Sequence, residues 1–201
     1  MIMAFDGAPI DGSVYLDVVR VADHAPSWLD DAVSLWSMYG LAVFAVLAGV
    51  GWWFARRAGG AAAVTALAVP VVVVLAYSVD AVLKLVVRED RPCQGLRVKT
   101  LEECPAPGDW SFPSNHAAIA AAAAVALFFV SRRLGSFAAV AAVAMAVSRV
   151  WVGVHYPHDV VAGMLVGGLV ALLSMTAARR WSRSVGRWIG SGRLRALVTV
   201  P

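Results

Sequence analysis

The chain has 201 residues, of which 60% are hydrophobic and 15% charged, with a formal net charge of +4. In ordinary soluble domains roughly a quarter of the residues are charged, so this composition excludes that class and indicates an integral membrane protein. We predict an all-α fold, a polytopic membrane bundle with about five transmembrane helices and an amphipathic helix at the amino terminus. Residues 1–201 are expected to form one domain.

The first 33 residues predict an outer surface segment. Apolar residues recur there at helical spacing, and acidic residues occupy other positions on the turn. The apolar positions are Val14, Val18, Val21, Ala25, Leu29 and Val33. We interpret them as one face of an amphipathic helix on the membrane surface, interrupted near Pro26. A solvated acidic tail is the alternative. The segment has no cleavable secretory signal, so the first span is expected to direct insertion.

Five apolar runs follow. They lie within residues 34–178, which we expect to form the transmembrane core. A bilayer-crossing helix needs ~20 residues, which three runs nearly reach alone and two reach only with their polar flanks. The runs are residues 35–54, 61–79, 117–130, 136–148 and 160–178.

Arginines after the first, third and fifth runs set the predicted orientation. Basic residues near span ends are retained on the cytoplasmic side. They are Arg56, Arg57, Arg132, Arg133, Arg179, Arg180, Arg183 and Arg187. All 13 acidic residues lie in the complementary segments. We therefore expect a multi-pass protein of the plasma membrane whose amino terminus and remaining loops face the extracytoplasmic side.

The loop after the second run contains both cysteines of the chain, Cys93 and Cys104. An outward loop lies in an oxidising compartment, which permits a disulfide between them. Two free thiols are the alternative. Their spacing matches no zinc signature, so no metal site is predicted.

Three cations lie at or near span ends, where an unpaired charge is costly and usually has a partner or serves a site. They are Lys84, Arg91 and Arg149. Arginine offers a planar fork for two oxygens and lysine a compact charge, so the mixture suits a phosphate group. For any one of them alone, snorkelling to the lipid headgroups is an equal explanation.

The sequence Pro113-Ser114-Asn115-His116 stands directly before the alanine-rich third run. Ser114 is the expected N-cap of that helix, whose free N–H groups would point outward at an anion. Capping alone is the alternative role for Ser114. His116 is the candidate acid, because the pKa of histidine lies near neutrality.

His155 precedes Pro157, which suits the first position of the fifth helix and places Asp159 in its first turn. From there the carboxylate can reach back to the imidazole. A histidine held in this way has a fixed tautomer and a free nitrogen for nucleophilic attack. Taken singly, Asp159 is also explained by the helix dipole and His155 by a structural contact. We interpret the adjacent His158 as a surface group and give His24 no role.

Residues 179–201 form a basic tail that contains Trp181 and Trp188 and no acid. Such a segment typically lies on an anionic leaflet with its indoles at headgroup level, so anionic lipid is its expected partner. Nucleic acid is the weaker interpretation and is not expected. In the fifth run, the small-xxx-small pair Gly163 and Gly167 indicates close helix packing.

The combination and order of these clusters resembles the three-part signature of the type 2 phosphatidic acid phosphatase superfamily. The matching segments are Lys84-x6-Arg91-Pro92, Pro113-Ser114-Asn115-His116 and Ser148-Arg149-x5-His155-x3-Asp159. The resemblance implies a helical membrane phosphatase with no cofactor and no metal. It further implies that His155 is a nucleophile forming a phosphohistidine, that Asp159 orients it, and that His116 protonates the leaving group.

The remaining positions of the signature imply a cradle for the phosphoryl oxygens. It would consist of Lys84, Arg91, Arg149, Ser114 and the backbone of Asn115. The family's usual residue at position 115 is glycine. Asparagine tolerates left-handed backbone better than most residues, so the turn expected there is compatible with Asn115.

Within the superfamily, the five-span plan and the non-glycine residue at position 115 are similar to the bacitracin-resistance type of undecaprenyl pyrophosphate phosphatase. The polar surface segment from Val19 to Gly40, which ends in Tyr39-Gly40 before the first span, is similar to that type as well. This implies hydrolysis of a polyprenyl (undecaprenyl or decaprenyl) diphosphate to the monophosphate, which recycles the lipid carrier for cell-wall synthesis. Alternative substrates are phosphatidate, phosphatidylglycerophosphate and a polyprenyl-phosphoryl sugar. A lipid-phosphate binding or transport protein is the alternative from a different class. The oligomeric state stays open.

Overall fold

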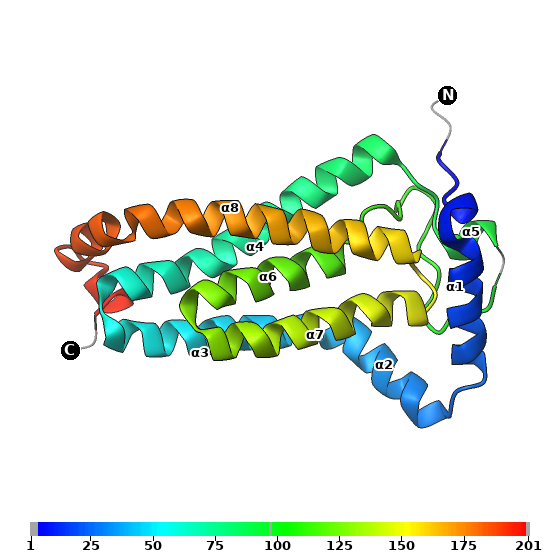
Figure 1. Cartoon of the computed structure of the whole chain (residues 1–201), viewed down its shortest axis with the longest axis horizontal. Coiled ribbons are helices and arrows are strands. Elements are labelled where there is room, and N and C mark those ends of the chain that lie inside the picture. Colours follow the sequence, from blue (N-terminus) through cyan, green and yellow to red (C-terminus); the bar gives the residue numbers. More distant parts are fainter. Residues whose placement is uncertain (1–3, 97, 200–201) are drawn as a thin grey trace.

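The computed structural model describes residues 4–96 and 98–199, and within them the chain is almost entirely helical. The long helices run side by side along the longest axis of the molecule (Figure 1). The elements are α1 (Ala8–Asp23), α2 (Ser27–Tyr39), α3 (Leu41–Ala58), α4 (Gly60–Val87), α5 (Pro92–Gly95), α6 (Asn115–Val130), α7 (Arg132–Trp151), α8 (Pro157–Gly190) and the 3-10 helix η1 (Arg195–Leu197). Helices α3, α4, α7 and α8 are long and apolar enough to cross a membrane. The prediction of an all-α membrane bundle is confirmed.

Helix α6 forms the centre of the bundle. At 16 residues it is shorter than the four candidate spans. It packs against α3, α4, α7 and α8, and most of its alanines are fully buried. Alanine contributes no long side chain, so the neighbouring helices approach its backbone closely. A helix enclosed in this way meets little lipid, which explains how a short and uniformly apolar segment fits here.

The contact between α6 and α8 depends on glycine. A Cβ atom added to Gly163 would overlap the carbonyl oxygen of Ser114, and one added to Gly167 would overlap that of Ala118. The packing role predicted for the two glycines is confirmed. The first contact also holds the start of α6 against the first turns of α8, and both helix starts belong to the candidate site.

Two helices extend beyond the apolar runs that predicted them. Helix α4 continues past Asp80, where the second span was expected to end, and reaches Val87. Asp80 and Lys84 are therefore buried residues of the same helix, one turn apart. Helix α8 has 34 residues, about 51 Å at 1.5 Å per residue, so it exceeds a ~30 Å hydrocarbon core. The first part of the basic tail is thus a continuation of α8.

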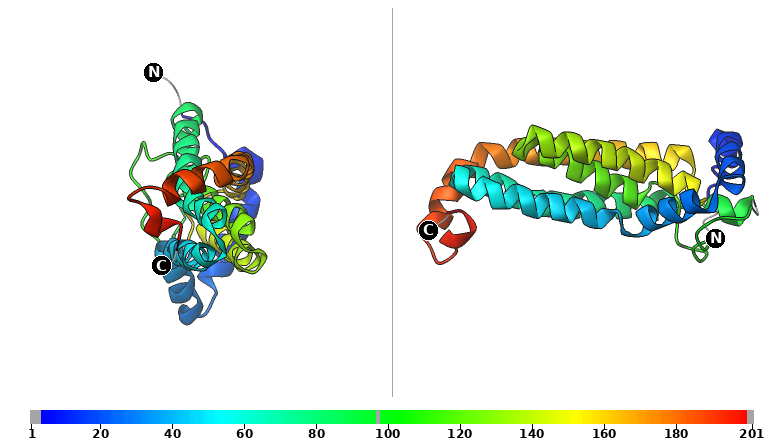
Figure 2. Two further views of the ribbon diagram at one scale, coloured as in Figure 1. Left: turned by 90° about the vertical axis from the view of Figure 1, so that its left-hand side faces the viewer. Right: turned by 90° about the horizontal axis from the view of Figure 1, so that it is seen from below.

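The amino-terminal segment covers one end of the bundle. Helix α1 lies across that end together with α5, and the chain's last described residues lie at the opposite end (Figure 2). The predicted interruption near Pro26 is confirmed, because α1 ends at Asp23 and α2 begins at Ser27. The side chain of Tyr15 is fully buried and its hydroxyl donates to the carbonyl of Gly153 at 2.8 Å. A solvated tail is therefore the wrong interpretation of this segment.

Candidate active site

The three clusters of the signature meet at the end of the bundle that α1 covers (Figure 1). Each contributes from a helix end or the loop beside it. Lys84 belongs to the last turns of α4, Arg91 precedes α5, Ser114, Asn115 and His116 begin α6, Arg149 ends α7, His155 lies between α7 and α8, and Asp159 is in the first turn of α8. Residues separated by up to 75 positions along the chain therefore share one site.

The imidazole of His155 lies between a carboxylate and a guanidinium. Its Nδ1 is 3.2 Å from Oδ2 of Asp159, and its Nε2 is 3.2 Å from Nη1 of Arg91. Arginine has donors only, so Nε2 must accept and the ring proton resides on Nδ1. Burial, together with Arg91 and the other nearby cations, lowers the pKa of His155 well below its usual value. The ring is therefore neutral, with the lone pair of Nε2 directed at the cationic side of the site.

Asp159 is fixed by three donors. Its Oδ2 accepts from the backbone N–H of Tyr156 at 2.8 Å, from the hydroxyl of Ser111 at 2.5 Å and from Nδ1 of His155. Pro157 is the first residue of α8 and Asp159 lies in its first turn, as the sequence predicted. Ser111 was missed, because it lies in an irregular loop where no periodicity or motif marks a contact partner.

Lys84 and Arg91 are buried, and both donate hydrogen bonds to the segment that connects α4 to α6. The ammonium of Lys84 donates to the carbonyls of Trp110 and Ser111, the latter at 3.3 Å. The guanidinium of Arg91 donates to the carbonyl of Val154 at 2.9 Å and to Oδ1 of Asp109 at 3.0 Å. The cations are thus fixed in place, and snorkelling to the headgroups does not describe either of them.

Arg149 has partners from two other parts of the chain. Its Nη1 donates to both carboxylate oxygens of Glu102, at 3.2 and 3.1 Å, and to the hydroxyl of Ser37 in α2. Neither partner was predicted. Glu102 was counted only as an outward acid, and Ser37 had no signal because it lies inside the first apolar run. A carboxylate bound at Arg149 shows that this side chain accepts an anion with two oxygens.

The start of α6 differs from the prediction in one respect. Ser114 occupies the N-cap position, but its side chain makes no capping hydrogen bond, so the capping interpretation of its hydroxyl is wrong. That hydroxyl is buried and has no partner among the described residues. Asn115 begins the helix with ordinary helical geometry, so the left-handed turn considered for this position is absent. His116 is in the first turn of α6, at the helix start that also carries Ser114 and Asn115.

His158 is not the surface group that the sequence suggested. Its Nδ1 is 2.7 Å from Oδ1 of Asp11 in α1, and its Nε2 is 2.8 Å from Oε1 of the buried Glu89. A ring with a carboxylate at each nitrogen donates from both only as the imidazolium. His158 therefore carries charge where His155 is neutral, and it ties α1 to the site. The partners come from distant segments, which a sequence pattern cannot reveal.

One group near the site has the spacing of metal ligands. Ligand atoms of Glu89, His158 and Asp159 lie within 4.8 Å of one another. Both nitrogens of His158 already contact carboxylates, so this cluster is accounted for as an ion-pair network.

A disulfide between Cys93 and Cys104 closes part of the segment that connects α4 to α6. Of the two possibilities left open by the sequence, the structure has the bridge. The bridge joins the segment just after Arg91 to the segment just after Glu102, and Asp109 follows five residues later. It therefore restricts the loop that holds the cations of the site.

Comparison with known proteins gives a family and several relatives. A family described as the PAP2 superfamily matches residues 65–183. The chain is 39% identical over 103 residues to undecaprenyl-diphosphatase of Sulfolobus acidocaldarius, covering 51% of this chain and 50% of that protein. It is 35% identical over 95 residues to undecaprenyl-diphosphatase BcrC of Bacillus subtilis, covering 47% and 48%. It is 42% identical over 120 residues to decaprenylphosphoryl-5-phosphoribose phosphatase of Mycolicibacterium smegmatis, covering 55% and 62%.

The chain spans about half the length of the first two of these curated relatives. Among solved structures it resembles that of Aquifex aeolicus LpxE, with a TM-score of 0.67 and 21% identity, covering 87% of this chain and 99% of that one. This likeness establishes a shared helical fold. The matched family residues include every position of the three clusters.

Proposed function

The chain belongs to the PAP2 superfamily, and on that basis we propose that it hydrolyses a polyprenyl diphosphate in the membrane to the monophosphate and inorganic phosphate. The observation that carries this proposal is the neutral imidazole of His155, held by Asp159 and facing three buried cations. Relatives named undecaprenyl-diphosphatase support the diphosphate as substrate.

In the first step, Nε2 of His155 attacks the terminal phosphorus of the diphosphate. The new N–P bond replaces the bond between that phosphorus and the bridging oxygen, and polyprenyl phosphate departs. Attack places positive charge on the ring, which Asp159 stabilises through the Nδ1–H bond. Arg91 now donates to Nε2, so it must exchange this contact for a phosphoryl oxygen when substrate binds. His116 donates a proton to the departing oxygen.

In the second step, water attacks the phosphohistidine. His116, having lost its proton, accepts one from this water, and the N–P bond breaks to release inorganic phosphate. His155 returns to its neutral form with Nδ1 protonated. The same residue therefore acts as acid and then as base, as microscopic reversibility requires for a two-step displacement.

The cations bind and stabilise the transferred group. Lys84, Arg91 and Arg149 are held in place before substrate arrives, so little reorganisation is needed as charge develops on the phosphoryl oxygens. The unpartnered hydroxyl of Ser114 and the N–H groups at Asn115 supply further donors at the start of α6. Without substrate, Asp109 is paired with Arg91 and Glu102 with Arg149, and a phosphate group would displace these carboxylates.

The active site belongs on the extracytoplasmic side of the plasma membrane in this proposal. A disulfide at this end of the bundle supports an oxidising compartment. The arginines that flank the transmembrane helices at the other end support the same orientation through the positive-inside rule. Such an enzyme would recycle the lipid carrier of cell-wall synthesis.

The test is phosphate release by the purified protein in detergent, with polyprenyl diphosphate, polyprenyl phosphate and phosphatidate compared in the presence of a chelator. We expect the diphosphate to be hydrolysed fastest and chelator to have no effect. Trapping with ³²P-labelled substrate and acid-labile, base-stable labelling would identify the phosphohistidine. Loss of turnover on adding chelator would contradict metal independence, and equal rates for His155→Ala and wild type would contradict the mechanism.

A second candidate substrate is a decaprenyl-phosphoryl sugar phosphate. It is favoured by 42% identity to the decaprenylphosphoryl-5-phosphoribose phosphatase of Mycolicibacterium smegmatis. The same cradle would bind a phosphate monoester, but the leaving group would be a sugar hydroxyl, which depends more strongly on His116. Including this lipid in the same assay distinguishes the two substrates by their kcat/KM.

A further inference from the structure

An apolar groove between α2 and α7 begins beside the candidate active site. Its volume is about 760 Å³, within the ~300–1,000 Å³ range of ligand pockets. Alanine, valine and tryptophan side chains of the two helices form its walls, together with Ser148. None of the residues that line it carries a formal charge.

The groove lies next to the phosphate cradle along both of its helices. Ser148 is in its wall, and the next residue is Arg149. On the facing helix, Trp36 is in the wall and the next residue, Ser37, accepts a hydrogen bond from Arg149. A ligand whose anionic group sits at Arg149 therefore has an apolar path leading directly away from it.

Two hydrogen bonds hold the two walls of the groove together. The Arg149 to Ser37 bond joins α7 to α2, and Nε1 of Trp151 donates to Oδ1 of Asp30 at 2.9 Å. Helix α2 lies at an angle to α7, and its beginning points away from the bundle (Figure 1). Val140 and Val147 on α7 remain 72% and 56% exposed, so this wall faces lipid.

We propose that the groove between α2 and α7 holds the first isoprene units of the substrate's polyprenyl chain. This inference rests on the proposed function. Membrane lipid is as apolar as the groove, so binding there gains little from the hydrophobic effect. The gain is orientation, because a chain lying along α7 presents its diphosphate to Arg149 and His155 in a fixed direction.

The test fills the groove without touching the cradle. Ala144 is an exposed wall residue five positions before Arg149, about 7.5 Å along the helix. The variant Ala144→Phe would block a long chain there, whereas dimethylallyl diphosphate, with a single isoprene unit, scarcely reaches that depth. The matched control is Ala178→Phe, which fills an apolar groove between α4 and α8 at the other end of the bundle.

We expect Ala144→Phe to lower kcat/KM for undecaprenyl diphosphate by ~10- to 100-fold, the scale of a displaced reacting group. Hydrolysis of dimethylallyl diphosphate should change by less than ~2-fold, and Ala178→Phe should leave both substrates near wild type, because neither change reaches the reacting atoms.

Several results would overturn the inference: unchanged turnover of the long substrate by Ala144→Phe, an equal loss on both substrates, or an equal loss in Ala178→Phe. The first of these would mean that ordinary membrane lipid fills the groove. Wild-type protein that hydrolyses neither diphosphate would instead overturn the proposed function, and this inference with it.

Discussion

Arginines gather at both ends of the bundle, but the two ends differ in how these side chains are held. At the end that α1 covers, Arg91 and Arg149 are 5% and 6% exposed and each has fixed acceptors. At the opposite end, a cavity of about 980 Å³ between α3, α4, α6, α7 and α8 has four arginines in its lining. They are Arg133, Arg179, Arg180 and Arg183.

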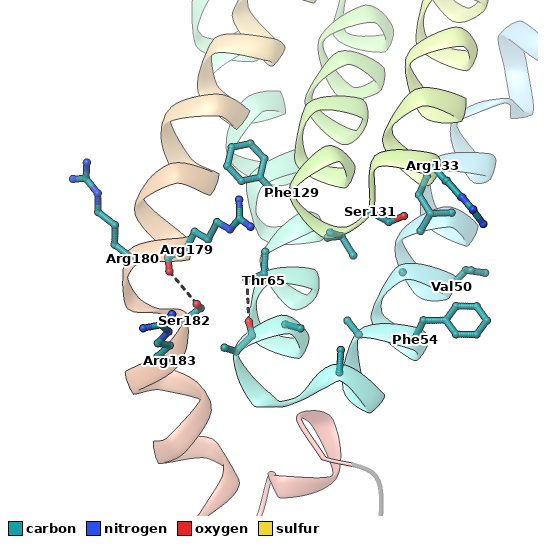
Figure 3. Close-up of a pocket in the computed structure, with 17 residues that line it drawn as sticks. Val50, Phe54, Thr65, Phe129, Ser131, Arg133, Arg179, Arg180, Ser182 and Arg183 are labelled. Atoms are coloured by element: carbon teal, nitrogen blue, oxygen red, sulfur yellow. Dashed lines mark hydrogen bonds between the residues drawn. The ribbon is translucent and has the colours of Figure 1, made fainter.

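The arginines of this cavity do not converge. In Figure 3, Arg179 points toward Phe129, whereas Arg180 points away from the cavity. The Arg179 guanidinium lies 5.9 Å from the ring centre of Phe129, and within the described residues none of the four forms an ion pair. The end with the more numerous arginines therefore lacks a fixed arrangement of cations. Burial and convergence, rather than the number of positive charges, distinguish the candidate active site from this cavity.

The largest predicted effect is the loss of turnover when His155, the proposed nucleophile, is removed. We expect His155→Ala to lower kcat by at least ~10⁴-fold, because no other group is placed to form the covalent intermediate. Phosphate release from polyprenyl diphosphate measures it. The matched control is His24→Ala, an exposed histidine of the amino-terminal segment that should retain full turnover. Similar rates for the two variants would remove the distinction between the ends.

The second prediction concerns the acid. We expect His116→Ala to lower kcat by ~10²–10⁴-fold on a lipid monophosphate, the range for loss of general acid–base catalysis. The loss should be smaller on the diphosphate, since polyprenyl phosphate is a better leaving group than an alkoxide. Steady-state rates on both substrates measure this difference. Turnover left intact on both would show that His116 is not the acid.

The third prediction compares one buried and one exposed arginine directly. We expect Arg149→Gln to lower kcat/KM by ~10²–10³-fold, as for loss of one preorganised donor to a transition-state oxyanion. Arg180→Gln, the same change at the opposite end of the bundle, should alter kcat/KM by less than ~2-fold, because an exposed unpaired charge contributes little. Parallel losses in the two variants would mean that bulk positive charge, and not geometry, supports activity.

The fourth prediction follows from the lowered pKa of His155. Below about pH 6.5 the unfolded chain binds a proton at this residue while the folded protein does not, so stability falls as the pH is lowered. The contribution is at most about 1.4 kcal/mol per pH unit. Thermal unfolding in detergent at pH 7 and pH 5 should therefore show a smaller acid-induced decrease of Tm for His155→Asn than for wild type. Equal decreases would contradict a neutral buried ring.

The smallest effect on turnover is expected at the end of the bundle opposite the candidate active site. The double variant Arg179→Gln with Arg183→Gln should keep kcat within ~2-fold of wild type, because an exposed charge far from the site contributes little to it. It should bind anionic vesicles more weakly, with a difference that disappears at high salt, because each basic residue near an anionic surface contributes about 1 kcal/mol. Vesicle sedimentation at low and high salt measures this. Unchanged vesicle binding would contradict the predicted role of the basic tail.

Local sequence was a good guide to the helices and to which helix ends carry the signature. Pro157 and Asp159 act on the helix turn to which they belong, so the start of α8 was predictable from neighbouring residues alone. The extension of α4 through Asp80 and Lys84 was not, because a charged pair inside a span is tolerated only when the neighbouring helices bury it.

Composition, hydrophobic periodicity and the order of the three clusters determined by themselves that this is a helical membrane protein and which residues are candidates for phosphate chemistry, since those signals depend on near neighbours in the chain. The tertiary structure decided which partner each candidate takes. Ser111, Glu102 and Glu89 contact Asp159, Arg149 and His158 across long stretches of sequence. Such contacts form where loops meet at one end of the bundle, and no periodic pattern encodes that meeting.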